Sequence, residues 1–276
     1  MREILDLRIP LEEAQRHLPP DAGKDDGLSR QLFLDVGDPL LERLRTLEAE
    51  YRARGTTLFT RCQVQRRYTP RELQSAEHLM LEVLPLFEPT GEECGTLYDE
   101  CRACSACGAG ARQRSELYLD LRRMPKGRDI AQTFGGEYVI SSRLAEALHL
   151  HGITGYELRP VLGRKGERSE SWHQLVISSA QVEVVPPTLA GRNHLAPEPD
   201  PARCPMGHVI GFQLLSPLYV SRASTHGQDW GFTRQLFGIR QGVFRPYPLM
   251  IISQRLYRLL KELKARRFEV EVAHQS

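Results

Sequence analysis

Three cysteines lie within the ten residues "CRACSACGAG", which begin at Cys101 and end at Gly110. Cys104 and Cys107 form a C-x-x-C motif that is followed by Gly108, a turn typical of zinc knuckles. Two thiolates at this spacing can bind one ion, and the glycine lets the backbone turn back past the sulfur atoms. One such pair supplies half of a tetrahedral metal site, so a second half is expected elsewhere in the chain.

The second half of the site is predicted far downstream, in "CPMGHVIG", where Cys204 and His208 lie four residues apart. With the first pair they make a Cys3His set, and thiolate and imidazole are the ligands that zinc favours. We therefore predict a structural zinc ion bound by Cys104, Cys107, Cys204 and His208.

Other interpretations of the cysteines stay open at this point. They include thiols without a metal, a catalytic zinc, and a redox C-x-x-C, although a redox motif normally opens a helix after a strand and that pattern is missing here. Cys101 could replace His208 as the fourth ligand. Cys94 and Cys62 are interpreted as ordinary small residues.

Familiar catalytic signatures are missing from the sequence, which contains no H-E-x-x-H and no G-x-S-x-G. A D-x-x-x-T pattern occurs twice, at Asp129 and Thr133 and again at Asp229 and Thr233. An aspartate can act as a base, but this spacing is also ordinary in loops and caps, and we favour the structural interpretation. The sequence therefore predicts a protein that is not an enzyme.

The elements that must position the cysteines are duplicated. "ISSRL" at 140–144 matches "ISQRL" at 252–256, and further matches follow in the same order over much of both segments. They pair Ser115, Leu117, Tyr118, Asp129, Thr133, Tyr156 and Glu157 with Ser216, Leu218, Tyr219, Asp229, Thr233, Phe268 and Glu269. We expect an approximate two-fold axis that brings the two knuckles together.

Each copy predicts a knuckle, a short strand, a loop, a second strand, a helix and a final strand. The helices are expected over 142–150, after Ser141, and over 254–266, after Ser253, because serine is a favoured N-cap residue. The strands are expected at 117–121, 138–140 and 156–161 in the first copy and at 214–220, 249–252 and 268–272 in the second.

Residues 1–90 are predicted to form a separate α/β region. It contains a strand in "REILDLRI", a helix over 38–55, a strand over 57–69, and a second helix in "TPRELQSAEHLMLEVL". The predicted fold class is therefore α+β, an N-terminal α/β part followed by a duplicated zinc-knuckle module. The expected boundaries are 1–90, 91–185 for the first repeat, 186–203 for a proline-rich linker, and 204–276 for the second repeat.

Composition is that of an ordinary globular protein, with 41% hydrophobic and 26% charged residues. No stretch approaches the roughly 18 apolar residues of a membrane helix, and the first residues do not resemble a signal peptide. We therefore expect a cytoplasmic protein, in a compartment that disfavours structural disulfides. The formal net charge of +2 indicates no global attraction to nucleic acid or membranes.

Residues 90–276 resemble the double-CXXCG-motif proteins of myxobacteria, through "ACSACG", the second cysteine knuckle and "EYVISSRLAEALHLHGITGYELRPV" between them. Some of those proteins are described as immunity proteins of swarm-inhibition toxin systems. The resemblance places its first motif on Cys104, Cys107 and Gly108, and its second on Cys204 and Gly207, where the second cysteine of the family is absent. It implies a zinc-stabilised protein that binds another protein, a cognate toxin.

The alternative function is a zinc-containing nucleic-acid-binding protein. The segment "RQRSELYLDLRRMPKGR" at 112–128 combines basic residues with Tyr118, and such a mixture can contact phosphates and stack on bases. Alternation within "ELYLDL" instead favours a strand with one buried face.

Overall fold

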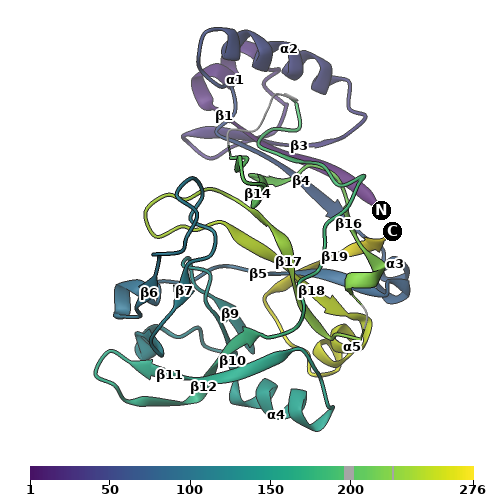
Figure 1. Cartoon of the computed structure of the whole chain (residues 1–276). Coiled ribbons are helices and arrows are strands. Elements are labelled where there is room, and N and C mark those ends of the chain that lie inside the picture. Colours follow the sequence, from purple (N-terminus) through teal and green to yellow (C-terminus); the bar gives the residue numbers. More distant parts are fainter. Residues whose placement is uncertain (196–201, 226) are drawn as a thin grey trace.

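The computed structural model describes residues 1–195, 202–225 and 227–276 (Figure 1). An N-terminal unit lies at one end of the molecule, and the two halves that carry the cysteines lie below it. The first and last residues lie side by side at one edge (Figure 1).

The N-terminal unit is an antiparallel sheet with two helices. Its strands are ordered β2 (Lys24–Asp25), β3 (Ser29–Asp35), β1 (Arg2–Pro10) and β4 (Arg61–Arg67), and its helices are α1 (Leu11–His17) and α2 (Leu40–Ala53). Leu5 and Leu7 of β1 and Leu44 of α2 are fully buried in its core. Leu195, which lies far along the chain, packs into the same core. The strand predicted in "REILDLRI" and the helix predicted over 38–55 are confirmed.

The first half contains a five-stranded sheet. Its order is β8 (Leu117–Leu119), β11 (Tyr156–Gly163), β12 (Arg168–Ile177), β10 (Tyr138–Ser141) and β9 (Ile130–Gln132), with α4 (Ser142–Leu150) between β10 and β11 in the chain. The second half contains a six-stranded sheet. Its order is β14 (Val209–Gly211), β17 (Trp230–Phe237), β18 (Tyr247–Ser253), β5 (His78–Val83), β19 (Phe268–Gln275) and β16 (Leu218–Val220), with α5 (Gln254–Glu262) between β18 and β19.

Short elements complete the described structure. They are α3 (Pro70–Ser75), the two-residue strand pairs β6 (Tyr98–Asp99) with β7 (Arg112–Gln113) and β13 (Ala190–Gly191) with β15 (Gln213–Leu214), and the 3-10 turns η1 (Glu92–Cys94), η2 (Leu121–Arg123) and η3 (Arg222–Ser224). No helix among the described residues is long and apolar enough to cross a membrane.

The two larger sheets correspond strand for strand. β8, β11, β12, β10 and β9 of the first half match β16, β19, β5, β18 and β17 of the second. The registers agree as well: Ser141 pairs with Trp172 where Ser253 pairs with His78. In the first half β8 runs parallel to β11, the strand that follows α4. In the second half β16 runs parallel to β19, the strand that follows α5.

One strand of each sheet is exchanged between the halves. β5 lies in the sheet of the second half, yet the chain that follows it enters the first half, where Phe87 bridges Thr133. β12 lies in the sheet of the first half, and the chain that follows it enters the second, where Val182 bridges Thr233. The strand β5, which leads into the first half, thus pairs in the sheet of the second half. The strand β12, which leads into the second half, pairs in the sheet of the first.

The correspondence between the two copies also includes residues that precede the cysteines in the chain. The Thr96 hydroxyl accepts from the Tyr118 amide, and the Thr188 hydroxyl accepts from the Tyr219 amide, at 2.9 and 2.8 Å. The next residues, both leucines, each donate a backbone N–H to a serine hydroxyl, Ser115 in one half and Ser216 in the other. Thr96-Leu97 and Thr188-Leu189 are thus equivalent positions.

The two halves share one core. Leu144 and Leu148 of α4 pack in the same buried cluster as Leu256 and Leu260 of α5, together with Trp230. Each of these five side chains is fully buried, and burial of one such side chain stabilises a fold by roughly 1.5–3 kcal/mol. Because the cluster draws on both halves, we expect them to unfold together.

The predicted α+β fold class is wrong. The structure is mostly β-sheet, with 38% strand and 20% helix, and its sheets are curled into half-barrels. The predicted second helix of the N-terminal region is also shorter than expected. The capping box of Thr69 and Glu72 starts α3, but the helix ends at Ser75, and His78–Val83 is the strand β5. Pairing with β18 and β19 on both sides overrides the helix propensity of its leucines and methionine.

The remaining predicted elements of the two copies are largely confirmed, except that the strand expected at 214–220 is divided into β15 and β16, which lie in different sheets. α4 covers 142–150 as expected, and α5 begins after Ser253 but ends at Glu262. The serines at 141 and 253 each accept a hydrogen bond from the backbone N–H three residues on, which is the N-cap geometry. Residues 196–201 of the predicted linker lie outside the described residues.

Candidate metal centre

Four side chains from the two halves meet at one point. Cys104 and Cys107 come from the first half, Cys204 and His208 from the second, and their ligand atoms all lie within 4.8 Å of one another. Cys107 and Cys204 are buried, Cys104 is partly buried and His208 is exposed. The clustering of these four residues, which we predicted from their types and spacing, is confirmed.

The distances between these atoms are compatible with four ligands around one tetrahedral metal ion, for which zinc bond lengths give a reference. The sulfur atoms of Cys104 and Cys204 lie 3.8 Å apart, and His208 Nδ1 lies 3.7 Å from both Cys107 Sγ and Cys204 Sγ. With Zn–S bonds of about 2.3 Å and a Zn–N bond of about 2.0 Å, tetrahedral geometry separates two sulfurs by about 3.8 Å and a sulfur from a nitrogen by about 3.5 Å. A disulfide would need roughly 2.0 Å between the sulfurs, and all six cysteines are free thiols.

Backbone turns hold both knuckles in place. In the first, the Gly108 N–H donates to the Cys104 carbonyl at 2.7 Å, and the Cys104 N–H donates to the Ala109 carbonyl at 2.8 Å. In the second, the Gly207 N–H donates to the Cys204 carbonyl and the Cys204 N–H to the Val209 carbonyl, both at 2.9 Å. Gly108 and Gly207 have φ values of 74° and 77°, in the left-handed region that favours glycine.

The second knuckle uses a longer side chain to reach the same point. Its left-handed glycine takes the place that Cys107 has in the first motif, and the ligand moves one residue on to His208. The backbone of His208 is fixed by β17, since the Leu236 N–H donates to its carbonyl at 2.8 Å. The imidazole of His208 thus lies where a second cysteine of this knuckle would otherwise be expected.

The local electrostatics favour thiolates at two positions. The backbone N–H groups of Cys107 and Ala106 lower the pKa of Cys104. Burial works against ionisation of Cys204, but the N–H groups of Met206 and His208 stabilise its thiolate and lower its pKa to about 6. Burial raises the pKa of Cys107 to about 11, and hydrogen bonding to the Cys104 and Cys204 sulfurs raises the pKa of His208.

The loop between β17 and β18 fastens the first knuckle to the second half. Arg240 and Arg245 both form ion pairs with Glu100, at 2.5 and 3.1 Å, and Arg245 lies over the ring of Tyr98 at 4.3 Å. The side chain of Arg240 also packs against Gly108, where an added Cβ would lie 2.9 Å from Arg240 Cδ. Arg240 and Arg245 belong to no sequence motif, and their contact with the first knuckle was not predicted from the sequence.

The other cysteines lie apart from the four ligands. Cys101 is exposed and is not a member of the clustered group, although its backbone N–H donates to Asp99 at 3.0 Å. Cys94 is buried in the turn η1. Cys62 donates to Asn193 Oδ1 at 3.1 Å, and burial raises its pKa to about 11. The structure therefore favours His208 over Cys101 as the fourth ligand.

The two D-x-x-x-T patterns support the helices. Asp129 accepts from the cap hydroxyl of Ser141 at 2.9 Å and pairs with Arg143, while Asp229 accepts from Ser253 at 2.6 Å. Thr133 and Thr233 are fully buried and make local hydrogen bonds, Thr133 in the turn after β9 and Thr233 within β17. These contacts agree with the structural interpretation of both patterns.

The sequence matches no protein-family model and no curated protein.

Proposed function

We propose that this chain is a non-enzymatic protein-binding protein whose two halves are stapled by a structural zinc ion. The observation that carries the metal assignment is the set of four ligand atoms at tetrahedral separations, two from each half. Four protein ligands leave no open position for water or substrate, and this is the usual arrangement of a structural site. Three sulfur ligands and one imidazole select zinc among the common divalent metals.

The zinc staple is tested with two matched cysteine variants. Metal content is measured on protein purified without added metal, and about one zinc per chain is expected. Cys107→Ser should lose the ion and lower the free energy of unfolding by several kcal/mol, because binding energy at a structural site is folding energy. Cys101→Ser, an exposed thiol outside the cluster, is the control and should retain both the ion and the stability. Well-folded, reduced wild-type protein without metal would overturn the proposal.

The proposed partner is a protein, and the resemblance to double-CXXCG-motif proteins supports a cognate toxin. An immunity role needs a rigid binding surface rather than reacting groups, and the shared core and the staple between the halves provide rigidity. The test is co-expression with the product of the adjacent gene, followed by size-exclusion chromatography and a growth assay. A 1:1 complex and rescue of growth support the immunity role, and toxicity that is unchanged by this chain contradicts it.

The structure offers little support for nucleic-acid binding by the basic segment 112–128. In the segment 112–128, Arg114 pairs with Asp99 at 2.5 Å, and Arg128 donates to the Pro85 carbonyl at 2.8 Å. Leu117 and Leu119 of the predicted strand are fully buried. A gel shift that weakens with added salt would favour this alternative over protein binding.

A further inference from the structure

A second concave site lies where the N-terminal unit meets the connection between the two halves. Its volume is about 290 Å³, the size of a small-molecule pocket. Its walls are formed by the end of α2, the start of β4, the start of β15 and residues 192–193, which are called the connecting segment below. The lining residues are Arg52, Thr57, Phe59, Thr60, Arg61, Cys62, Gln63, Arg192, Asn193, Phe212 and Gln213. None of the four metal ligands is among them.

The pocket is lined by three arginines, two of which form ion pairs with buried carboxylates behind the wall. The arginines are Arg52, Arg61 and Arg192, and the described lining residues include no carboxylate. Guanidinium groups match the oxygens of phosphate with paired N–H donors, which gives short, charge-assisted hydrogen bonds.

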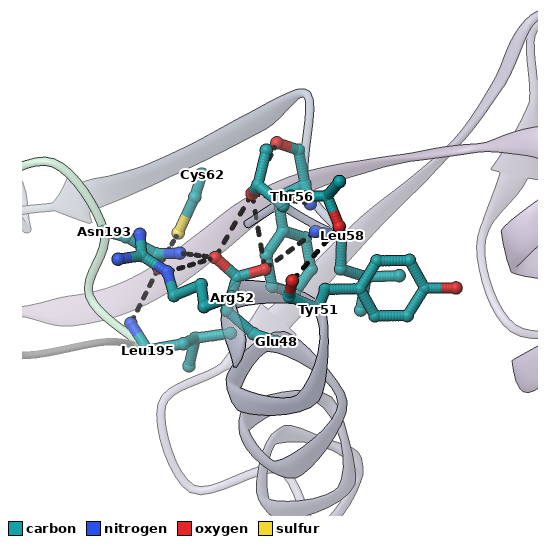
Figure 2. A network of polar contacts seen from close by, with 10 residues as sticks. Glu48, Tyr51, Arg52, Thr56, Leu58, Cys62, Asn193 and Leu195 are labelled. Carbon is teal, nitrogen blue, oxygen red and sulfur yellow. Dashed lines mark hydrogen bonds and ion pairs between the residues drawn. The ribbon is translucent and has the colours of Figure 1, made fainter. Parts of the chain in front are cut away.

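Buried carboxylates orient two of these arginines from behind. Glu48 is fully buried and accepts from Arg52 Nε at 2.8 Å (Figure 2). Asp6 is also buried and lies 3.1 Å from Arg61 Nε. Pairing through Nε fixes the plane of each guanidinium group before any ligand arrives. Such preorganisation reduces the entropy lost on binding.

The third arginine is oriented by an aromatic ring. The Arg192 guanidinium carbon lies 5.7 Å from the centre of the Phe212 ring. Stacking on a ring uses the face of a guanidinium group and leaves its N–H edge available for an anion. Phe212 and Phe59 also give the pocket apolar surface beside the charges.

Hydrogen bonds fix the walls relative to each other. Gln213 Nε2 donates to the carbonyls of Cys62 and Arg192, at 2.6 and 3.0 Å, and so ties β4 to the connecting segment. Asn193 Nδ2 donates to Glu48 at 2.9 Å and joins that segment to α2 (Figure 2). The pocket is therefore held by contacts among residues that are far apart in the chain.

We propose that this pocket binds a small organic phosphate, with the phosphate against the arginines and the carbon skeleton against Phe212. The probe is phenyl phosphate, added to the full-length, metal-loaded chain and followed by isothermal titration calorimetry at constant ionic strength. Saturable binding is expected, tighter than that of inorganic phosphate because the ring adds apolar contact. Benzoate, which has the ring but a singly charged carboxylate, should bind more weakly.

Two variants of exposed arginines distinguish binding in the pocket from nonspecific attraction of the anion to positive charge on the surface. Arg192→Gln removes one phosphate donor and should weaken phenyl phosphate binding about tenfold or more. Arg258→Gln on α5 removes an exposed arginine elsewhere and should leave binding unchanged. Unchanged melting temperatures would show that both variants are folded. Lack of saturable binding, benzoate binding as tight as that of phenyl phosphate, or equal effects of the two variants would overturn the proposal. None of these results depends on the zinc staple or on a protein partner.

Discussion

Arg143 and Arg255 each bind the C-terminal end of the other half's helix. Arg143, at the start of α4, donates to the Leu263 carbonyl at the end of α5 at 3.2 Å. Arg255, at the start of α5, donates to the carbonyls of His151 and Gly152 at the end of α4, both at 2.6 Å. The last carbonyls of a helix lack intrahelical partners and carry partial negative charge, so each arginine stabilises its neighbour.

Replacing Arg255 should destabilise both halves. Arg255→Gln loses charge-assisted contacts to two carbonyls, and we expect the free energy of unfolding to fall by about 1–2 kcal/mol. Arg258→Gln, one turn further along α5, should change it by less than about 0.5 kcal/mol. Urea denaturation measures both values, and an equal effect of the two substitutions would contradict the role of Arg255.

Because β5 connects the two halves, we expect a destabilising substitution in β5 to lower the unfolding midpoint of both halves. Leu81 lies in β5 and is buried, so Leu81→Ala should cost about 2–5 kcal/mol. Trp172 reports on the sheet of the first half and Trp230 on that of the second. Fluorescence of single-tryptophan forms should show the same shifted midpoint at both positions. A shift confined to Trp230 would mean that the halves unfold independently.

The elements that sequence predicted well are those with local signals. Ser141 and Ser253 start helices with an apolar face, and both helices form where expected. The clustering of the four candidate ligands could be predicted because cysteine and histidine at these spacings are typical of metal sites.

The exchanged strands lacked such signals. β12 is mostly polar at its start and β5 has the composition of a helix, so neither shows the alternation of a half-buried strand. Both segments form strands because they pair with strands on both sides, β5 with β18 and β19 and β12 with β10 and β11. The equivalence of Thr96 and Thr188 was also missed, because the chain between each threonine and its knuckle differs in length between the copies.

Glu48 should be essential to the N-terminal unit. This fully buried carboxylate accepts from Arg52, from the Leu58 N–H at 2.9 Å and from Asn193 (Figure 2). Glu48→Gln removes the charge and turns an amide group towards donors, so we expect a loss of about 3 kcal/mol or more. Glu50→Gln, at an exposed position on the same helix, is the control. Comparable stabilities of the two variants would contradict this role.

Stability should fall as the pH drops below neutrality, partly through His78. Burial lowers the pKa of His78, so the unfolded chain takes up this proton at a higher pH than the folded chain does. The stability is therefore fully present above the ordinary value of 6.5 and is lost as the pH falls through it. The neutral ring also accepts from Gln275 Nε2 at 2.8 Å, a contact that protonation removes.

The test compares wild type with His78→Gln in the metal-loaded state between about pH 8 and pH 6. The variant should show a smaller decrease in unfolding free energy over this interval. Metal content measured at both ends excludes loss of the ion as the cause. Identical slopes would assign the pH dependence to other groups, such as His173, His194 and His274, whose pKa values are also lowered by burial.

The exchanged strand β5 has a consequence for synthesis on the ribosome. β5 ends at Val83, but its neighbours β18 and β19 begin only at Tyr247 and Phe268. At roughly 5–20 residues per second, this apolar strand has left the ribosome on the order of ten seconds before its partners are made. The first half can complete its own sheet in that interval only after β12 has emerged. The nascent chain therefore carries an unpaired hydrophobic strand through most of translation, which makes it a natural client for chaperones that bind extended apolar segments.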